Sequence, residues 1–261
     1  TAGRTTLAGE GLQHQDGHSH LMASVVPNIK AYDPAYAYEI AVIIHDGLKR
    51  MYVDQEDVFY YITLENENYI HPPILKNTEE GIIKGMYKFK EIKTEKNLNI
   101  QLLASGSMLN EVIEAAKILK DDWGIGSDIW SVTSFSELHR EAEDKSRWNT
   151  LHPTSKPKQS YLESCIKDKN GPVVAVSDYV KLVAEQIAPY LKCPFIALGT
   201  DGFGRSETRD ELRSFFEINR YYIAMTAIES LSKEGKIDKG EIQKAIEKYN
   251  LDPEKSNPIT V

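Results

Sequence analysis

Short apolar segments that favour strands alternate with helical patterns along most of this chain, and this alternation constrains the fold most strongly. The segments typical of strands are 28–32, 58–64, 100–104, 128–132, 173–176 and 195–198. The apolar spacing predicts helices over 34–52, 109–119, 136–147, 208–216, 219–234 and 239–249, with another after Asp178. Such alternation predicts an α/β fold with a mainly parallel sheet covered by helices.

Several polar residues are predicted to fix the ends of these helices. Asp33 precedes Pro34, a pair typical of an N-cap followed by the first helical position. Asp178 is expected to cap the helix that follows it. The segment 105–107, Ser-Gly-Ser, is expected to cap the helix that follows the strand at 100–104. A domain boundary is predicted near 70–80, because a His-Pro-Pro sequence there is followed by a polar, charged stretch over 76–99.

Composition excludes several classes of protein. The 261 residues carry 31 basic and 39 acidic side chains, a net charge of −8, which gives no electrostatic footprint for nucleic acid or an anionic membrane. No apolar run approaches the ~18 residues of a membrane helix, and a hydrophobic share of 41% is ample for a core. Cys165 and Cys193 form no disulfide framework, which fits a reducing cytoplasm, and both are expected to be inert thiols.

The chain begins at Thr1, and its first 28 residues are rich in Gly, Ser, Thr and His without a clear helical or strand period. Irregular segments of this kind are usually held on both sides by a scaffold. We therefore expect the chain to be part of a longer protein.

The densest group of reactive side chains lies in this irregular segment: Glu10, His14, Asp16, His18 and His20 fall within eleven residues. Three interpretations compete. Three imidazoles can bind a metal, although the spacing matches no established motif. The histidines can instead be hydrogen-bonded loop residues, or the loop can line an active site where imidazole acts as an acid, a base or a hydrogen-bond donor.

A second candidate is the glycine-rich segment 199–206, Gly-Thr-Asp-Gly-Phe-Gly-Arg-Ser, which follows a predicted strand and precedes a helix. That position suits an anion bound at a helix N-terminus, but the segment is neither a dinucleotide fingerprint nor a P-loop. A structural turn is the alternative.

Several strings of this sequence closely resemble homodimeric-type pyruvate dehydrogenase, the thiamine-diphosphate-dependent decarboxylating component of the pyruvate dehydrogenase complex. The strings are TAGRTTL from Thr1, GEGLQH from Gly9, DGHSH from Asp16, YDPAYAYE from Tyr32 and LGTDGFGRS from Leu198. The resemblance implies that residues 1–75 are the last part of a middle, pyrimidine-type domain. Residues 76–261 would be a transketolase-like C-terminal domain.

The resemblance also implies roles for two side chains. His14 matches the family's active-site histidine and would contact the substrate-derived part of the thiamine adduct, and Glu10 would lie near the substrate channel. The family's thiamine-activating glutamate and its Mg²⁺- and diphosphate-binding segment have no counterpart in this sequence. The resemblance therefore implies that no residue of this sequence binds the cofactor or the metal ion. It also implies that these 261 residues are inactive by themselves.

The implied activity is that of an oxidoreductase in pyruvate metabolism. It would decarboxylate pyruvate with thiamine diphosphate and Mg²⁺, then reductively acetylate the lipoyl domain of the dihydrolipoyl acetyltransferase component. The working enzyme would be a cytoplasmic homodimer. Two alternatives stay open: 76–261 as a structural and partner-binding module whose segment 199–206 binds an anion or a partner, and a related 2-oxo-acid decarboxylase or transketolase-like enzyme.

Overall fold

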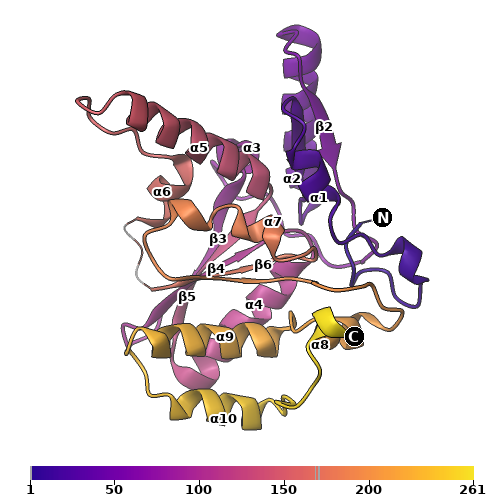
Figure 1. The fold of residues 1–261 in the computed structure, drawn as a ribbon, viewed down its shortest axis with the longest axis vertical. Coiled ribbons are helices and arrows are strands. Elements are labelled where there is room, and N and C mark those ends of the chain that lie inside the picture. Colours follow the sequence, from indigo (N-terminus) through magenta and orange to yellow (C-terminus); the bar gives the residue numbers. More distant parts are fainter. Residues whose placement is uncertain (1, 168, 170) are drawn as a thin grey trace.

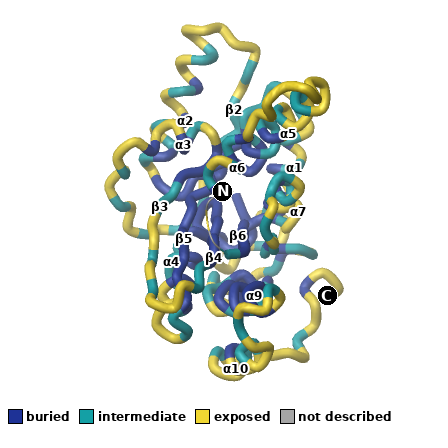
Figure 2. Tube along the Cα trace, turned by 90° about the vertical axis from the view of Figure 1, so that its left-hand side faces the viewer, coloured by how far each residue is buried: buried dark blue, intermediate teal, exposed yellow. Residues whose placement is uncertain are grey.

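The computed structural model describes residues 2–167, 169 and 171–261, and within them the strands form two separate sheets (Figure 1). The smaller sheet pairs β1 (Ile29–Tyr32) with β2 (Phe59–Ile62) in parallel. The helix α1 (Ser19–Ser24) precedes this sheet, and α2 (Ala37–Leu48) connects its strands. The turn from α2 to β2 projects farthest from the body, and its residues 52–57 are exposed (Figures 1 and 2).

The larger sheet has the strand order β3-β5-β4-β6-β7, with β3 antiparallel to β5 and the remaining neighbours parallel. Its strands are β3 (Met86–Ile92), β4 (Asn99–Ala104), β5 (Gly126–Val132), β6 (Val173–Val176) and β7 (Phe195–Leu198). This arrangement confirms the α/β fold with a mainly parallel sheet. A parallel sheet is covered on both faces, which explains why the interior strand β6 is apolar and buried throughout.

Helices cover both faces of the larger sheet, and alternate residues of β4 show which helices lie on which face. Leu102 packs with α4 and α9, whereas Leu103 packs with α5, α6 and α7. The helix α10 lies outside α9, at the lower edge of Figure 1. The bounds are α3 (Glu79–Lys84), α4 (Met108–Ile118), α5 (Phe135–Leu151), α6 (Tyr161–Ile166), α7 (Leu182–Glu185), α8 (Arg209–Phe215), α9 (Arg220–Lys233) and α10 (Gly240–Lys248). The buried residues concentrate on these central layers (Figure 2).

The structure differs from the sequence-based prediction in two connecting segments. The polar stretch 76–99 contains α3 and the edge strand β3, where exposed lysines face solvent and apolar residues pack inward. Charged side chains of this kind are typical of edge strands. The helix α5 extends to Leu151, beyond the predicted end at 147, and α6 was not predicted.

The helix predicted over 34–52 begins later than expected. Its first residue is Ala37 and its N-cap is Tyr36, so the prediction that Asp33 caps it is wrong. The buried Glu39 closes this end instead, because its Oε2 accepts hydrogen bonds from the backbone N–H groups of Ala35 and Tyr36. The predicted apolar face is only partly covered: Ile43 is buried while Ile44 is exposed.

Candidate functional site

The two sheets point the carboxyl ends of their parallel strands at a common junction. In the larger sheet β4 and β6 are neighbours, and the helices that follow them, α4 and α7, pack on opposite faces. Ligands of open α/β sheets bind outside the carboxyl ends of strands at such a switch point. Here the polar residues after β1, β2, β4 and β6 meet at that place, together with the N-terminal segment.

Three carboxylates lie in this junction: Asp33 after β1, Glu65 after β2 and Asp178 after β6. Asp33 Oδ2 accepts a hydrogen bond of 2.7 Å from Ser105 Oγ, and its Oδ1 accepts one of 2.6 Å from Thr63 Oγ1. Glu65 Oε2 accepts the backbone N–H of Ser107. These bonds join the smaller sheet to the carboxyl end of β4.

Asp178 holds the N-terminal segment in the junction. Its carboxylate accepts hydrogen bonds from Thr5, 2.7 Å from the side-chain hydroxyl and 3.0 Å from the backbone N–H. Its backbone C=O accepts the N–H of Arg4 at 3.2 Å. The predicted helix-capping role of Asp178 is therefore wrong, because α7 begins only at Leu182 and Lys181 precedes it.

The segment 105–107 provides the N-cap position of α4, as predicted, but no side-chain capping bond. Ser107 precedes α4 but its side chain makes no capping hydrogen bond, and Ser105 binds Asp33 instead. Gly106, with φ of +53°, lies against two carboxylates: a Cβ there would overlap the Glu65 carboxylate and lie 2.9 Å from Asp33 Oδ2. Only glycine fits this position, and its contacts place Asp33 and Glu65 beside one another.

Burial changes the protonation of these acids. Burial, with further contributions from the charges of Asp33 and Asp178, raises the pKa of Glu65 well above its ordinary value. Burial also raises the pKa of Asp178 to about 6, although its hydrogen bonds with Thr5 and the positive charge of Arg213 oppose the change. Neighbouring carboxylates in a desolvated site cannot all be charged at low cost, so the junction retains protons.

The buried Arg213 supplies positive charge beside this cluster. Its guanidinium pairs with Glu67 from the smaller sheet's region and lies 3.5 Å from Glu111 of α4. Glu111 also pairs with Arg220, at 2.8 Å. Because Arg213 contacts carboxylates from both parts of the chain, it fixes the smaller sheet against the larger one.

The three histidines of the segment 10–20 do not converge on one point. His20 is buried, its Nε2 lies 2.9 Å from Thr63 Oγ1, and its ring packs edge-on against Tyr179. Burial lowers the pKa of His20. His14 and His18 are exposed. Among the described residues no group of three or more His, Cys, Asp or Glu side chains is arranged to hold a metal ion, and the three histidines of this segment are not brought together.

His14 and Glu10 lie on an exposed loop at the edge of the junction. His14 ends a short 3₁₀ turn (Leu12–His14), closed by its N–H to the C=O of Gly11 at 3.0 Å. Both predicted site residues are exposed, and no hydrogen bond or ion pair holds either side chain among the described residues. They are therefore free to contact a bound molecule, in contrast to the buried histidine His20.

The glycine-rich segment 199–206 supports this loop from the larger sheet. Arg4, which is buried, donates hydrogen bonds to the C=O groups of Thr200 and Gly202. The backbone N–H of Arg205 donates to Gln15 Oε1 at 2.6 Å. The segment is thus a structural turn with a specific partner, the loop that carries His14.

Three residues that organise the junction were not predicted from the sequence to belong to the site: Arg4, Glu65 and Arg213. A signal was available for Glu65, because polar residues directly after strands gather at the carboxyl edge of a parallel sheet. No local pattern announces Arg213, whose partners Glu67 and Glu111 are 146 and 102 residues away in the chain.

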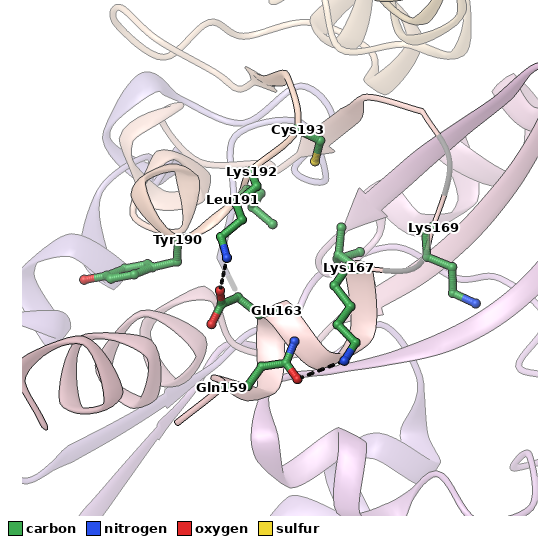
Figure 3. A pocket seen from close by; sticks show the side chains of 9 residues that line it. Gln159, Glu163, Lys167, Lys169, Tyr190, Leu191, Lys192 and Cys193 are labelled. Carbon is green, nitrogen blue, oxygen red and sulfur yellow. Dashed lines mark hydrogen bonds and ion pairs between the residues drawn. The ribbon is translucent and has the colours of Figure 1, made fainter. Parts of the chain in front are cut away.

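A hollow with a volume of about 220 Å³ lies at the amino-terminal ends of β6 and β7, away from the junction (Figure 3). Its lining includes Lys167, Lys192 and Cys193, and neither His14 nor Glu10. Lys192 lies 3.5 Å from Glu163, and burial raises the pKa of the Cys193 thiol. A raised pKa suppresses the reactive thiolate, in accord with the expected inert cysteine.

The described residues include no helix long and apolar enough to cross a membrane.

Comparison with known families assigns both parts of the chain. Residues 85–219 match the family described as transketolase-like TK C-terminal domain, and residues 1–72 match the family described as pyruvate dehydrogenase E1 component middle domain. The first match covers more than half of the chain, which therefore belongs to the transketolase-like C-terminal domain family.

Whole-sequence comparison gives the particular relatives. The chain is 55% identical over 260 residues to the pyruvate dehydrogenase E1 component of Pseudomonas aeruginosa, covering 99% of this chain and 30% of that protein. It is 52% identical to the pyruvate dehydrogenase E1 component of Escherichia coli K12, covering 99% and 29%. The resemblance to a C-terminal portion of pyruvate dehydrogenase is thereby confirmed. The chain spans about 30% of the length of these relatives.

Solved structures with the same fold are transketolases. A Pichia stipitis transketolase complex aligns with a TM-score of 0.65 at 18% identity, covering 90% of this chain and 30% of that chain. Transketolase from Leishmania mexicana gives 0.61 at 19% identity, covering 89% and 30%. At this identity the likeness establishes the fold alone.

Proposed function

We propose that these residues form the C-terminal part of a pyruvate dehydrogenase E1 component. Such an enzyme decarboxylates pyruvate with thiamine diphosphate and Mg²⁺ and reductively acetylates the lipoyl group of the dihydrolipoyl acetyltransferase component. The observation that carries this proposal is an identity of 51–55% to three E1 components over essentially the whole chain. Residues 1–75 would complete the middle domain and 76–261 would be the C-terminal domain of a cytoplasmic homodimer.

Within this function His14 is the residue that we assign to the substrate. An imidazole on an exposed loop can donate a hydrogen bond to the carboxylate or the developing negative charge of a bound 2-oxo acid. Glu10, exposed on the same loop, would shape the approach to that site. When bound, thiamine diphosphate supplies the electron sink for decarboxylation.

We assign these residues no step of the chemistry beyond contact with the substrate. We further propose that the 261 residues alone do not turn over pyruvate, because no stretch of this sequence matches the family's thiamine-activating glutamate or its Mg²⁺- and diphosphate-binding segment. In an assay of CO₂ release with thiamine diphosphate and Mg²⁺, we expect no turnover from this chain by itself. Measurable turnover would contradict that part of the proposal.

The substrate class is tested with the complete protein that contains these residues. Release of CO₂ from pyruvate is compared with ketol transfer from a ketose phosphate, and acetylation of an isolated lipoyl domain is followed separately. We expect decarboxylation of pyruvate and acetylation of the lipoyl domain. Ketol transfer without decarboxylation would instead identify a transketolase-like enzyme and contradict the proposal.

A further inference from the structure

We infer that the glycine-rich segment 199–206 positions His14 through a direct contact between Gly204 and Gln15, so that the C-terminal domain sets the geometry of the substrate loop. This inference rests on the proposed function of His14. Gln15 and Gly204 act as positioning residues, because neither is assigned a contact with substrate.

Gln15 follows His14 directly in the sequence but differs from it in exposure. Its side chain is buried, with 7% of the residue exposed, whereas His14 is exposed. Its backbone N–H donates to the C=O of Leu12 at 3.2 Å, which completes the turn that ends at His14. Its Oε1 accepts the N–H of Arg205 at 2.6 Å. Gln15 therefore anchors the turn to the larger sheet's loop.

Gly204 lets the two backbones approach closely enough for this bond. A Cβ at Gly204 would lie 2.8 Å from the Cβ of Gln15 and 3.3 Å from the backbone oxygen of Leu12. The first distance is too short for two carbon atoms, so any side chain larger than hydrogen displaces the turn. The hydrogen-bonded residues Arg205 and Gln15 are 190 positions apart in the sequence.

Further bonds hold both sides of the contact in place. Arg4 fixes the segment 199–206 at the C=O groups of Thr200 and Gly202. Beyond His14, the C=O of Gly17 accepts the N–H of Val180 at 2.8 Å, and before it the N–H of Gly9 donates to the C=O of Glu207 at 3.0 Å. With both flanks of the loop tied to the C-terminal domain, a change at Gln15 or Gly204 moves His14 rather than the flanks.

The test is a double-mutant cycle in the complete enzyme, measured as kcat for pyruvate decarboxylation. Gln15→Leu removes the acceptor at similar size, and we expect kcat to fall roughly 10- to 100-fold, the usual cost of a small misplacement of a reacting group. Gln15→Glu retains an oxygen acceptor and is expected to restore most of the activity. In a His14→Ala background, Gln15→Leu should cause no further loss.

Gly204→Ala tests the same contact from the other side, with a similar fall expected and again no added effect beside His14→Ala. Ser206→Ala is the matched control, because Ser206 is exposed in the same segment and should leave kcat unchanged. Circular dichroism confirms folding of each variant. Losses that persist fully in the His14→Ala background would overturn the inference, since they would show a general structural effect. A His14→Ala variant with normal turnover would instead overturn the proposed role of His14.

Discussion

The carboxylate of Asp178 shows how one buried acid can join two parts of a chain and carry a dependence on pH. Thr5 donates two hydrogen bonds to it from the N-terminal segment, and Glu65 and Asp33 share its desolvated surroundings. Burial raises its pKa from 3.8 to about 6. The folded chain therefore binds this proton more tightly than the unfolded chain does.

The free energy of unfolding should reflect this difference. The stability that the Asp178 proton contributes is fully present below about pH 3.8 and is lost as the pH rises through about 6. Asp178→Asn keeps an oxygen that can accept from Thr5 but cannot ionise. We expect the stability of the Asn variant, relative to the parent, to rise between about pH 4 and pH 6, measured by urea denaturation. A constant difference across this range would contradict the raised pKa.

Among the helices and strands, those that rest on local apolar pattern were predicted best. The strands Val173–Val176 and Phe195–Leu198 have the predicted bounds, because each is a continuous apolar run, the mark of a buried parallel strand. The edge strand β3 was missed, although its run Tyr87-Lys88-Phe89-Lys90 alternates apolar and charged side chains as a half-exposed strand does.

The ends of elements were predicted less well, for a physical reason. Asp33 and Asp178 both have capping chemistry, but each finds a stronger tertiary partner. Ser105 lies 72 residues from Asp33, and Thr5 lies 173 residues from Asp178, so no local pattern could reveal either bond. Of the candidate site, the sequence predicted the loop with Glu10 and His14. The packing of Gln15 against the segment 199–206 could not be predicted without the fold, and the catalytic assignments stay predictions.

The end of α3 provides a direct test of how closely elements pack. Gly85 ends this helix with φ of +107°, and a Cβ there would lie 2.6 Å from the C=O oxygen of Ser134. Gly235 also has positive φ, +70°, but no atom lies within 4 Å of its Cβ position. We expect Gly235→Ala to cost about 1 to 2 kcal/mol from backbone strain alone. Gly85→Ala should cost at least about 1 kcal/mol more, because it adds an overlap in a packed region.

Thermal or urea unfolding of the two alanine variants measures this comparison. Equal losses would show that Ser134 moves away without cost, and the close approach of α3 to the start of α5 would then contribute nothing to stability.

In the whole molecule, the parallel strands of both sheets direct their carboxyl ends at one junction, and Thr5, Asp33 and Glu65 lie beyond the ends of β4 and β6. Where many α/β proteins bind a ligand, this chain binds its N-terminal segment. The larger sheet therefore supports the loop at 9–15, and His14 is exposed on this loop.

The proposed function depends on His14 more than on any other side chain. Pyruvate turnover by the complete enzyme tests the role of His14 most directly. His14→Ala is compared with His18→Ala, which removes another exposed imidazole from the same segment. We predict that His14→Ala lowers kcat by about 100-fold or more, the usual effect of losing one donor to developing negative charge. His18→Ala should leave kcat nearly unchanged. Normal pyruvate turnover by the His14→Ala enzyme would contradict the account.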